Sequence, residues 1–321
     1  MILESVRERP VVGRNPEAVA IGSLFVTLFA VSLWMRLVAG VGYHRLHALL
    51  DLGGPSPLYV IAVPTFFLYV VGLALGAVVC ARVRHVEIPF DLPARDDLPV
   101  AVATVLSAPL LVAAAGLAGH LLLDTSMSAM AQIRYAPDAG LSFLLLASVV
   151  PAAFEGLGYG FLFFGVVHER LRTATTPRHA VVLTPAVVWF FREIHGEVQT
   201  DLLSPTALVH LALLVGVGVA FGSSVGLLYR GAVRDSAGQL VRAIYIPVFT
   251  LGLLGVFGVV SELTFPTAVL EAVHLAGFGL AGYGYERTRS IWVPVVVLGV
   301  LFGTPDIVSF AETATGVVTP V

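Results

Sequence analysis

The chain alternates long apolar stretches with short polar connections. Nine stretches of mainly apolar residues follow one another along its 321 residues. A transmembrane helix needs about 20 such residues, each rising 1.5 Å along the axis. The pattern therefore predicts an all-α, polytopic membrane helix bundle with about nine spans, at residues 18–42, 56–81, 98–123, 140–167, 179–199, 204–228, 241–261, 267–285 and 291–311.

The positions of the arginines predict how these spans are oriented. All 18 basic residues are arginines, and fourteen of them fall in the N-terminal segment or in loops on the same side of the membrane. Arg45 and Arg134 lie on the opposite side, while Arg36 and Arg192 lie inside spans. Because cytoplasmic loops carry the excess of positive charge, we expect the N-terminus inside and the C-terminus outside the cell membrane.

Composition narrows the class of protein further. Hydrophobic residues make up 57% of the chain and charged residues 12%, whereas soluble domains carry about 25% charged residues. The net charge of −3 offers no basic surface for nucleic acid. A single cysteine, Cys80, allows neither an internal disulfide nor a thiolate metal cage. We therefore expect one integral domain surrounded by the lipid bilayer, with three spans in residues 1–139 and the others in 140–321.

Two polar residues inside predicted spans are candidates for chemistry. Glu155 lies thirteen residues before His168, where its span leaves the membrane, and His195 lies sixteen residues after His179, where the next span begins. These spacings place both at depths of roughly 20–24 Å on consecutive antiparallel helices. A carboxylate and an imidazole that meet there can activate a water for hydrolysis. The alternative is that each is a neutral side chain hydrogen-bonded inside the bundle.

A further group of polar residues gathers toward the opposite side of the membrane. Glu271 and His274 share one helical face at a spacing of three residues. Together with His210 they are weak candidates for metal ligands, because a metal site needs three or four ligands in a set geometry. An interfacial position without a metal is the alternative, and we expect no cofactor. The group also includes His120 and Asp124.

Three segments resemble the CPBP family of CAAX prenyl proteases and bacteriocin-processing intramembrane endopeptidases, also called Abi. That family carries EExxxR on one helix, FxxxH on the next and HxxxN or HxxxD on a later one. Here "GYGYERTRSIWVPVVVLGVLF" (282–302) is similar to the family's lead into its last motif, and "FREIH" (191–195) fits FxxxH. "FEGLGYGFLFFG" (154–165) resembles the neighbourhood of EExxxR. The resemblance identifies 140–321 as a CPBP-like core, with an extra helix pair within 196–273.

The first motif departs from the family pattern. If Glu155 is its first glutamate, Gly156 replaces the second and Gly160 replaces the arginine. If Glu155 is the second glutamate, Phe154 and Tyr159 stand at the other two positions. Either alignment leaves Glu155 as the one carboxylate of the motif.

The last motif departs as well. Leu298 stands where the family has its histidine, and Phe302 where it has an amide or a carboxylate. His210 or His274 could supply a substitute group. An oxyanion donor or half of an acid–base pair contributes about 10²–10⁴ in rate, so its loss bears directly on activity.

The resemblance implies a function and two alternatives remain open. It implies a glutamate-type intramembrane endopeptidase that cleaves membrane-anchored or prenylated peptides, in which Glu155 activates water and His195 assists. The departures favour instead a catalytically inactive member that acts as a scaffold or binds a membrane partner. Mid-membrane Glu and His residues would also suit a proton-coupled transporter.

Overall fold

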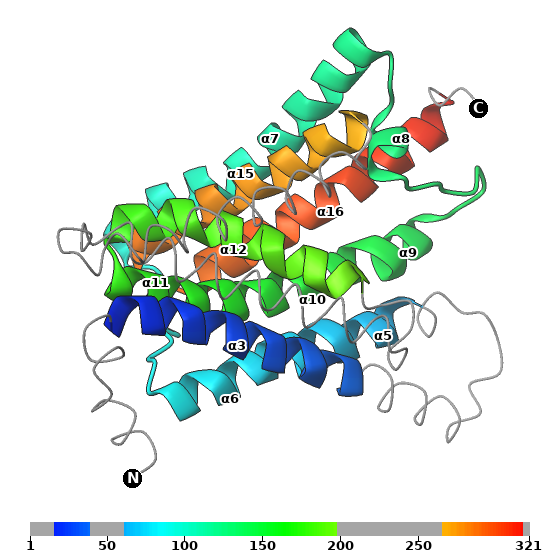
Figure 1. The fold of residues 1–321 in the computed structure, drawn as a ribbon. Coiled ribbons are helices and arrows are strands. Elements are labelled where there is room, and N and C mark those ends of the chain that lie inside the picture. Colours follow the sequence, from blue (N-terminus) through cyan, green and yellow to red (C-terminus); the bar gives the residue numbers. More distant parts are fainter. Residues whose placement is uncertain (1–15, 39–60, 198–264, 317–321) are drawn as a thin grey trace, which may run out of the picture.

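A computed structural model describes residues 16–38, 61–197 and 265–316 of the chain (Figure 1). Within these ranges every regular element is a helix and no strand occurs, which confirms the all-helical prediction for this part. The predicted spans 204–228 and 241–261 lie outside the described residues, as does the proposed extra helix pair that they would form.

Two long helices contain π-helical turns. The first consists of α5 (Val63–Thr65), η3 (Phe66–Ala74) and α6 (Leu75–Arg84). The second consists of α9 (Leu141–Leu144), η5 (Leu145–Val149), α10 (Val150–Tyr159), η6 (Gly160–His168) and α11 (Glu169–Ala174). π-Turns are uncommon and often occur at functional sites. Here η3 itself carries Tyr69 into the bundle, and η5 and η6 flank α10, which carries Glu155.

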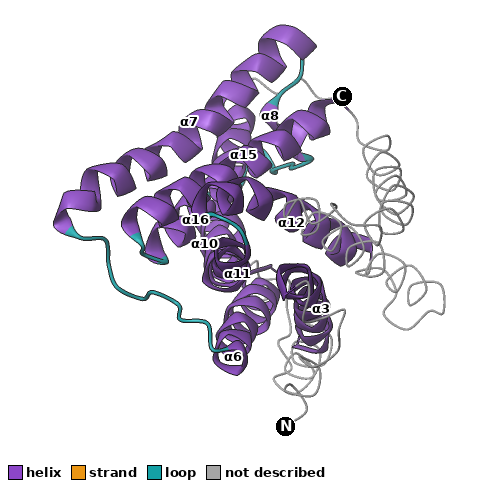
Figure 2. Cartoon of the chain, turned by 60° about the vertical axis from the view of Figure 1, so that its left-hand side comes forward, coloured by secondary structure: helices purple, strands orange, loops and turns teal. Residues whose placement is uncertain are grey.

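The other helices pack beside these two and complete the described bundle. They are α3 (Pro16–Leu37), η4 (Arg95–Asp97), α7 (Leu98–Leu123), α8 (Met127–Ala131), α12 (Pro177–Glu197), α15 (Phe265–Thr288) and α16 (Trp292–Thr315). α16 packs against α7, α10 and α15, while α3 packs on η3 and α6 at the other side of the bundle (Figures 1 and 2). Helices on both sides of residue 140 therefore pack into one bundle.

Four of these helices are long and apolar enough to cross a membrane. They cover Val63–Arg84, Arg95–Leu123, Leu141–Ala174 and Trp292–Thr315. α3, α12 and α15 are helices at three more of the predicted ranges. The length and composition of these helices thus support a membrane protein, while the multi-pass topology, the count of nine spans and the orientation of the termini stay predictions.

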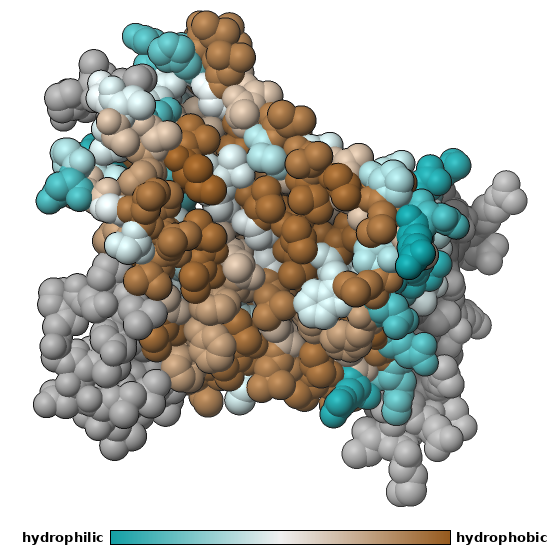
Figure 3. Space-filling model, turned by 180° about the vertical axis from the view of Figure 1, so that it is seen from behind, coloured by the Kyte–Doolittle hydropathy of each residue, from teal (hydrophilic) through white to brown (hydrophobic). Residues whose placement is uncertain are grey.

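The surface has the polarity of a membrane-embedded bundle. Seen from behind, hydrophobic side chains cover the middle of the molecule and hydrophilic ones gather at two opposite ends (Figure 3). Along α7, Leu106, Leu110, Leu117 and Leu121 are all more than half exposed. In water so many exposed leucines would be costly, whereas lipid covers them without penalty.

The backbones of α10 and α16 come close together. A Cβ atom added at Gly156 would meet the backbone nitrogen of Gly299 at 2.5 Å and the carbonyl oxygen of Val295 at 2.6 Å. A Cβ atom at Gly160 would meet the side chain of Val295 at 2.5 Å. These two positions would hold the second glutamate and the arginine of the EExxxR motif if Glu155 were the first glutamate. The packing of this bundle leaves no room for either side chain.

Two connections fix the ends of α16. At its start, the Ser290 hydroxyl donates to the Asp91 carbonyl at 2.7 Å, and the Trp292 indole N–H donates to the Phe90 carbonyl at 2.8 Å. At its far end, the Glu312 carboxylate accepts from two backbone N–H groups at the start of α8, both at 2.9 Å. α16 is therefore held at both ends, and α8 is placed beside the cavity described next.

Candidate functional site

A cavity of about 280 Å³ lies between the helices of the bundle. Five separate parts of the chain converge on it: η3, α10, the end of α12, the start of α15 and the middle of α16, with α8 and the loop after it at the rim. Its lining residues are Tyr69, Ala131, Ile133, Glu155, Tyr159, Arg192, Leu270, His274, Phe302, Pro305 and Asp306. Such a volume holds several water molecules or a small ligand group.

Glu155 lies on the wall of this cavity. Its side chain interacts with Tyr69 from η3, and the Arg192 guanidinium lies within electrostatic range. No ion pair joins Glu155 to another of the described side chains. The carboxylate therefore faces open volume and a phenol, which leaves its oxygens accessible to a water or a ligand.

Arg192 brings α12 and α15 together beside the cavity. Its two terminal nitrogens each contact one carboxylate oxygen of Glu271 at 2.9 Å. His274 lies against the same pair, with its Nδ1 3.5 Å from Arg192 and 3.7 Å from Glu271. A bidentate Arg–carboxylate pair is rigid and directional. It fixes the end of α12 and the start of α15 as one wall of the cavity.

Asp306 supplies a second carboxylate to the cavity lining. It interacts with the hydroxyls of Ser148 and Tyr135, which themselves lie 2.5 Å apart. Burial raises the pKa of Tyr135, which lies in the loop before α9, so its hydroxyl stays protonated and can donate to these oxygens. No ion pair reaches Asp306 from the part of the chain that the structure describes.

Aromatic rings form the apolar walls. Tyr159 packs against Tyr69 and Phe302, with ring centroids 5.6 Å and 5.5 Å apart. Phe163 stacks on Tyr159 and contacts Phe191 edge to face. Phe191, the first residue of the FxxxH segment, is almost fully buried in this cluster. The aromatic cluster thus sets the spacing between α10, α12 and α16 around the cavity.

The predicted site residues are placed as follows. Glu155 and His274 line the cavity, and Glu271 is bound to its wall through Arg192. His195 lies in the last turn of α12, but its side chain lies outside the described residues, so its predicted meeting with Glu155 stays a prediction. His210 lies outside the described residues altogether.

The remaining polar candidates lie elsewhere. His120 and Asp124 are exposed at the end of α7 and take no part in the cavity lining. Within the described ranges, no three His, Cys, Asp or Glu side chains lie close enough to hold a metal ion. The weak metal candidates Glu271 and His274 are neighbours, but the cation beside them is the guanidinium of Arg192.

Sequence analysis missed three residues of the site. Asp306 lies one turn after Phe302 on the same face of α16. An acidic residue within an apolar helix is the same sequence signal that identified Glu155, so it could also have identified Asp306. Tyr69 and Tyr159 gave no signal, because a tyrosine in a membrane helix has no special sequence context. They became visible only once η3 and α10 were packed together.

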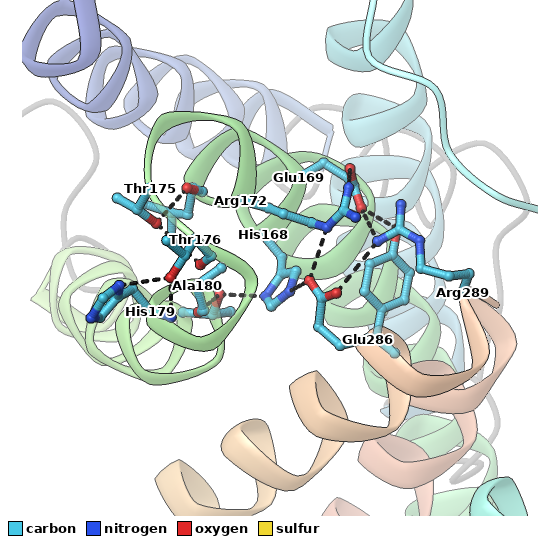
Figure 4. A network of polar contacts seen from close by, with 12 residues as sticks. His168, Glu169, Arg172, Thr175, Thr176, His179, Ala180, Glu286 and Arg289 are labelled. Atoms are coloured by element: carbon cyan, nitrogen blue, oxygen red, sulfur yellow. Dashed lines mark hydrogen bonds and ion pairs between the residues drawn. The ribbon is translucent and has the colours of Figure 1, made fainter.

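A second polar cluster, largely buried, joins α11, α12, α15 and the end of η6 (Figure 4). His168 is fully buried; its Nε2 lies 2.9 Å from Glu286, and its Nδ1 lies 2.9 Å from the Thr184 hydroxyl. Glu286 also pairs with Arg172 at 3.2 Å. Glu286 belongs to the 282–302 segment that resembles the CPBP family. In this structure it ties α15 to α11 and to the end of η6.

The same cluster contains a second carboxylate with its own partners. Glu169 pairs with Arg289 at 2.8 Å and accepts a hydrogen bond from the buried Tyr285 hydroxyl at 2.9 Å. The Arg289 guanidinium also lies over the Tyr285 ring, 5.0 Å from its centroid. We call this set, with His168, Arg172 and Glu286, the Arg-rich cluster. Every charge in it has a partner of opposite charge.

No protein-family model matches the chain, and no solved structure matches it.

Proposed function

We propose that this protein is an intramembrane endopeptidase of the CPBP type, in which Glu155 activates water to cleave a membrane-anchored peptide. The observation that carries the proposal is the position of Glu155, which opens onto a cavity of about 280 Å³ inside a bundle of apolar helices. A carboxylate that is accessible to water but shielded from bulk solvent is suited to act as a general base. The helices that carry the family-like segments, α10, α12 and α16, all contribute to that cavity.

The reaction would proceed in two steps. Glu155 takes a proton from a water, and the oxygen of that water bonds to the carbonyl carbon of the peptide. The C–N bond then breaks, and the proton passes from Glu155 to the leaving amine. Three described groups of the lining could donate to the developing oxyanion: the hydroxyls of Tyr69 and Tyr159 and the guanidinium of Arg192. His195 would assist Glu155, as the FxxxH resemblance implies.

One observation favours the inactive alternative. Phe302 lines the cavity at the position where the family has an amide or a carboxylate, and a phenyl ring can neither bind an oxyanion nor transfer a proton. A protein with this lining that binds a membrane segment without cutting it would act as a scaffold.

A cleavage assay separates these functions. The full chain would be reconstituted in liposomes with single-span reporter peptides, and new termini would be identified by mass spectrometry. We expect Glu155→Gln to lower the cleavage rate by about 10²–10⁴ and His195→Ala to lower it as well. Glu87→Gln is the matched control, because it makes the same change at an exposed loop residue.

Two outcomes would refute the proposal. Equal product from the wild type, Glu155→Gln and His195→Ala would exclude catalysis by these residues. Absence of cleavage together with proton uptake into the liposomes that Glu155→Gln abolishes would instead indicate a transporter.

A further inference from the structure

Among the described residues, the cavity is surrounded by more negative than positive charge. Three described carboxylates lie at or beside it, from Glu155, Asp306 and Glu271, and Arg192 is the one arginine among the described lining residues. That guanidinium is engaged with both oxygens of Glu271. Even with His274 protonated, the described groups would carry one net negative charge. An excess of carboxylate charge in a low-dielectric site attracts either protons or a cation.

The two carboxylates without an ionic partner lie on different helices of the same cavity. Glu155 comes from α10 and Asp306 from α16, and the two are close enough to influence each other electrostatically. Their described polar partners are neutral hydroxyls, Tyr69 for the first and Ser148 with Tyr135 for the second. Both carboxylates can therefore turn their remaining acceptor capacity toward a cation in the cavity.

The apolar part of the lining contains aromatic rings of the kind that attract organic cations. The rings of Tyr69, Tyr159 and Phe302 all line the cavity. The face of an aromatic ring carries partial negative charge and attracts ammonium and guanidinium groups, the more so where water is excluded. Carboxylates and aromatic faces in one cavity favour a cation with an organic body. The described residues contain no ligand set for a metal ion.

We propose that this cavity binds an organic cation, an alkylammonium or alkylguanidinium group, held by Asp306 and Glu155 against the rings of Tyr69, Tyr159 and Phe302. Where the ligand is a peptide, the group is the side chain of a lysine or arginine within the bound membrane segment. This last step rests on the proposed function and makes a basic side chain near the scissile bond the specificity determinant. The binding of the cation itself does not require that the protein cut anything.

The decisive experiment compares a cation with its neutral isostere. Calorimetric titration of the detergent-solubilised full chain with n-butylguanidinium and with n-butylurea separates charge from shape. Titration of protein-free micelles corrects for partition into detergent. We expect n-butylguanidinium to bind at least tenfold more tightly than n-butylurea. Equal affinity for both probes would overturn the proposal without any variant being needed.

Two variants locate the binding site. Because a hydrogen bond to a charged group is among the stronger ones, Asp306→Asn should weaken n-butylguanidinium binding about tenfold or more and leave n-butylurea binding unchanged. Asp138→Asn makes the same change at an exposed loop residue and should change neither. Equal loss in both variants, or none in Asp306→Asn, would overturn the assignment to this cavity. Displacement of n-butylguanidinium by Na⁺ at equal concentration would show an inorganic cation site instead.

An experiment with reporter peptides distinguishes the cation site from the peptidase activity. Reporter peptides that carry arginine or citrulline, its neutral isostere, at the same membrane depth would be offered to the reconstituted protein. Preferential cleavage of the arginine peptide supports both proposals. Cation binding without cleavage refutes the peptidase and keeps the cation site. Cleavage of both peptides at one rate, with no preference for n-butylguanidinium, refutes the cation site and keeps the peptidase.

Discussion

The two buried polar regions of this bundle have opposite charge organisation. In the Arg-rich cluster, Glu169 pairs with Arg289 and Glu286 pairs with both His168 and Arg172. Around the cavity, Glu155 and Asp306 face open volume, and neither has an ion pair within the described residues. Charges that are fully paired hold helices together, whereas charges that face a cavity remain accessible to a ligand. We therefore expect the first region to stabilise the fold and propose that the second binds a ligand.

The largest expected effect is on the Arg-rich cluster. Glu286→Ala removes the partner of the fully buried His168 and of Arg172. Loss of one partner of a buried ion pair typically costs about 3–5 kcal/mol. Because Arg172 is partly exposed, we expect about 3 kcal/mol of lost unfolding free energy, measured by denaturant unfolding in detergent. Glu87→Ala is the control, and a loss in Glu286→Ala no larger than in that control would contradict a structural role.

A smaller loss is expected where one hydrogen bond to a charge is removed. The buried Tyr285 hydroxyl donates to Glu169 at 2.9 Å. Tyr285→Phe keeps the ring and removes that bond, so the unfolding free energy should fall by about 1.5–2 kcal/mol. Tyr283→Phe, on the same helix but exposed, should cost far less in the same unfolding experiment. Equal losses would show that the hydroxyl of Tyr285 adds nothing.

A neighbouring pair of arginines tests the partly exposed edge of the cluster. Arg289 pairs with Glu169, whereas Arg287 lies over the exposed ring of Tyr283. Since the Arg289 side chain is 40% exposed, its ion pair is worth only about 1 kcal/mol. We expect Arg289→Gln to lower the melting temperature and Arg287→Gln to lower it less than half as much. A larger fall in melting temperature for Arg287→Gln than for Arg289→Gln would place the stabilising contact outside the cluster.

The smallest change in stability is expected at the cavity. Neither Glu155 nor Asp306 has an ionic partner to lose, and burial of each carboxylate opposes folding. Glu155→Gln and Asp306→Asn should therefore change the unfolding free energy by less than about 1 kcal/mol, in either direction, while the first lowers the cleavage rate and the second weakens cation binding. If either destabilised the protein as much as Glu286→Ala does, the contrast between the two regions would fail.

Part of the site was accessible from the sequence because it depends on local rules. Glu155 stood out as a carboxylate in an apolar helix, and it lies on the cavity wall. Glu271 and His274 were expected on one helical face, and they are neighbours in space. Their joint partner was not expected, because Arg192 lies 79 residues from Glu271 along the chain. Nothing in either segment indicates which face of α12 turns toward α15.

The family-like segments illustrate the same limit. Residues 282–302 were interpreted as the approach to a catalytic motif. In the structure Glu286 ties helices together in the Arg-rich cluster, while Ser290 and Trp292 hold the backbone of the loop between α6 and η4. Gly156 was a departure from a motif in the sequence and is a point of backbone contact in the structure. Residue identity alone does not distinguish a residue selected for chemistry from one selected for close packing.

The sequence by itself determined that this chain is a set of apolar helices and where Glu155 lies along one of them. Those properties follow from the length of apolar runs and from the cost of placing charge in lipid, both of which act within one helix. Only the tertiary structure decided that Tyr69, Glu155, Arg192, His274 and Asp306 surround one cavity and that the Arg-rich cluster is fully paired. These are properties of helices brought together from distant parts of the chain, and their packing depends on side-chain shapes that no local pattern encodes.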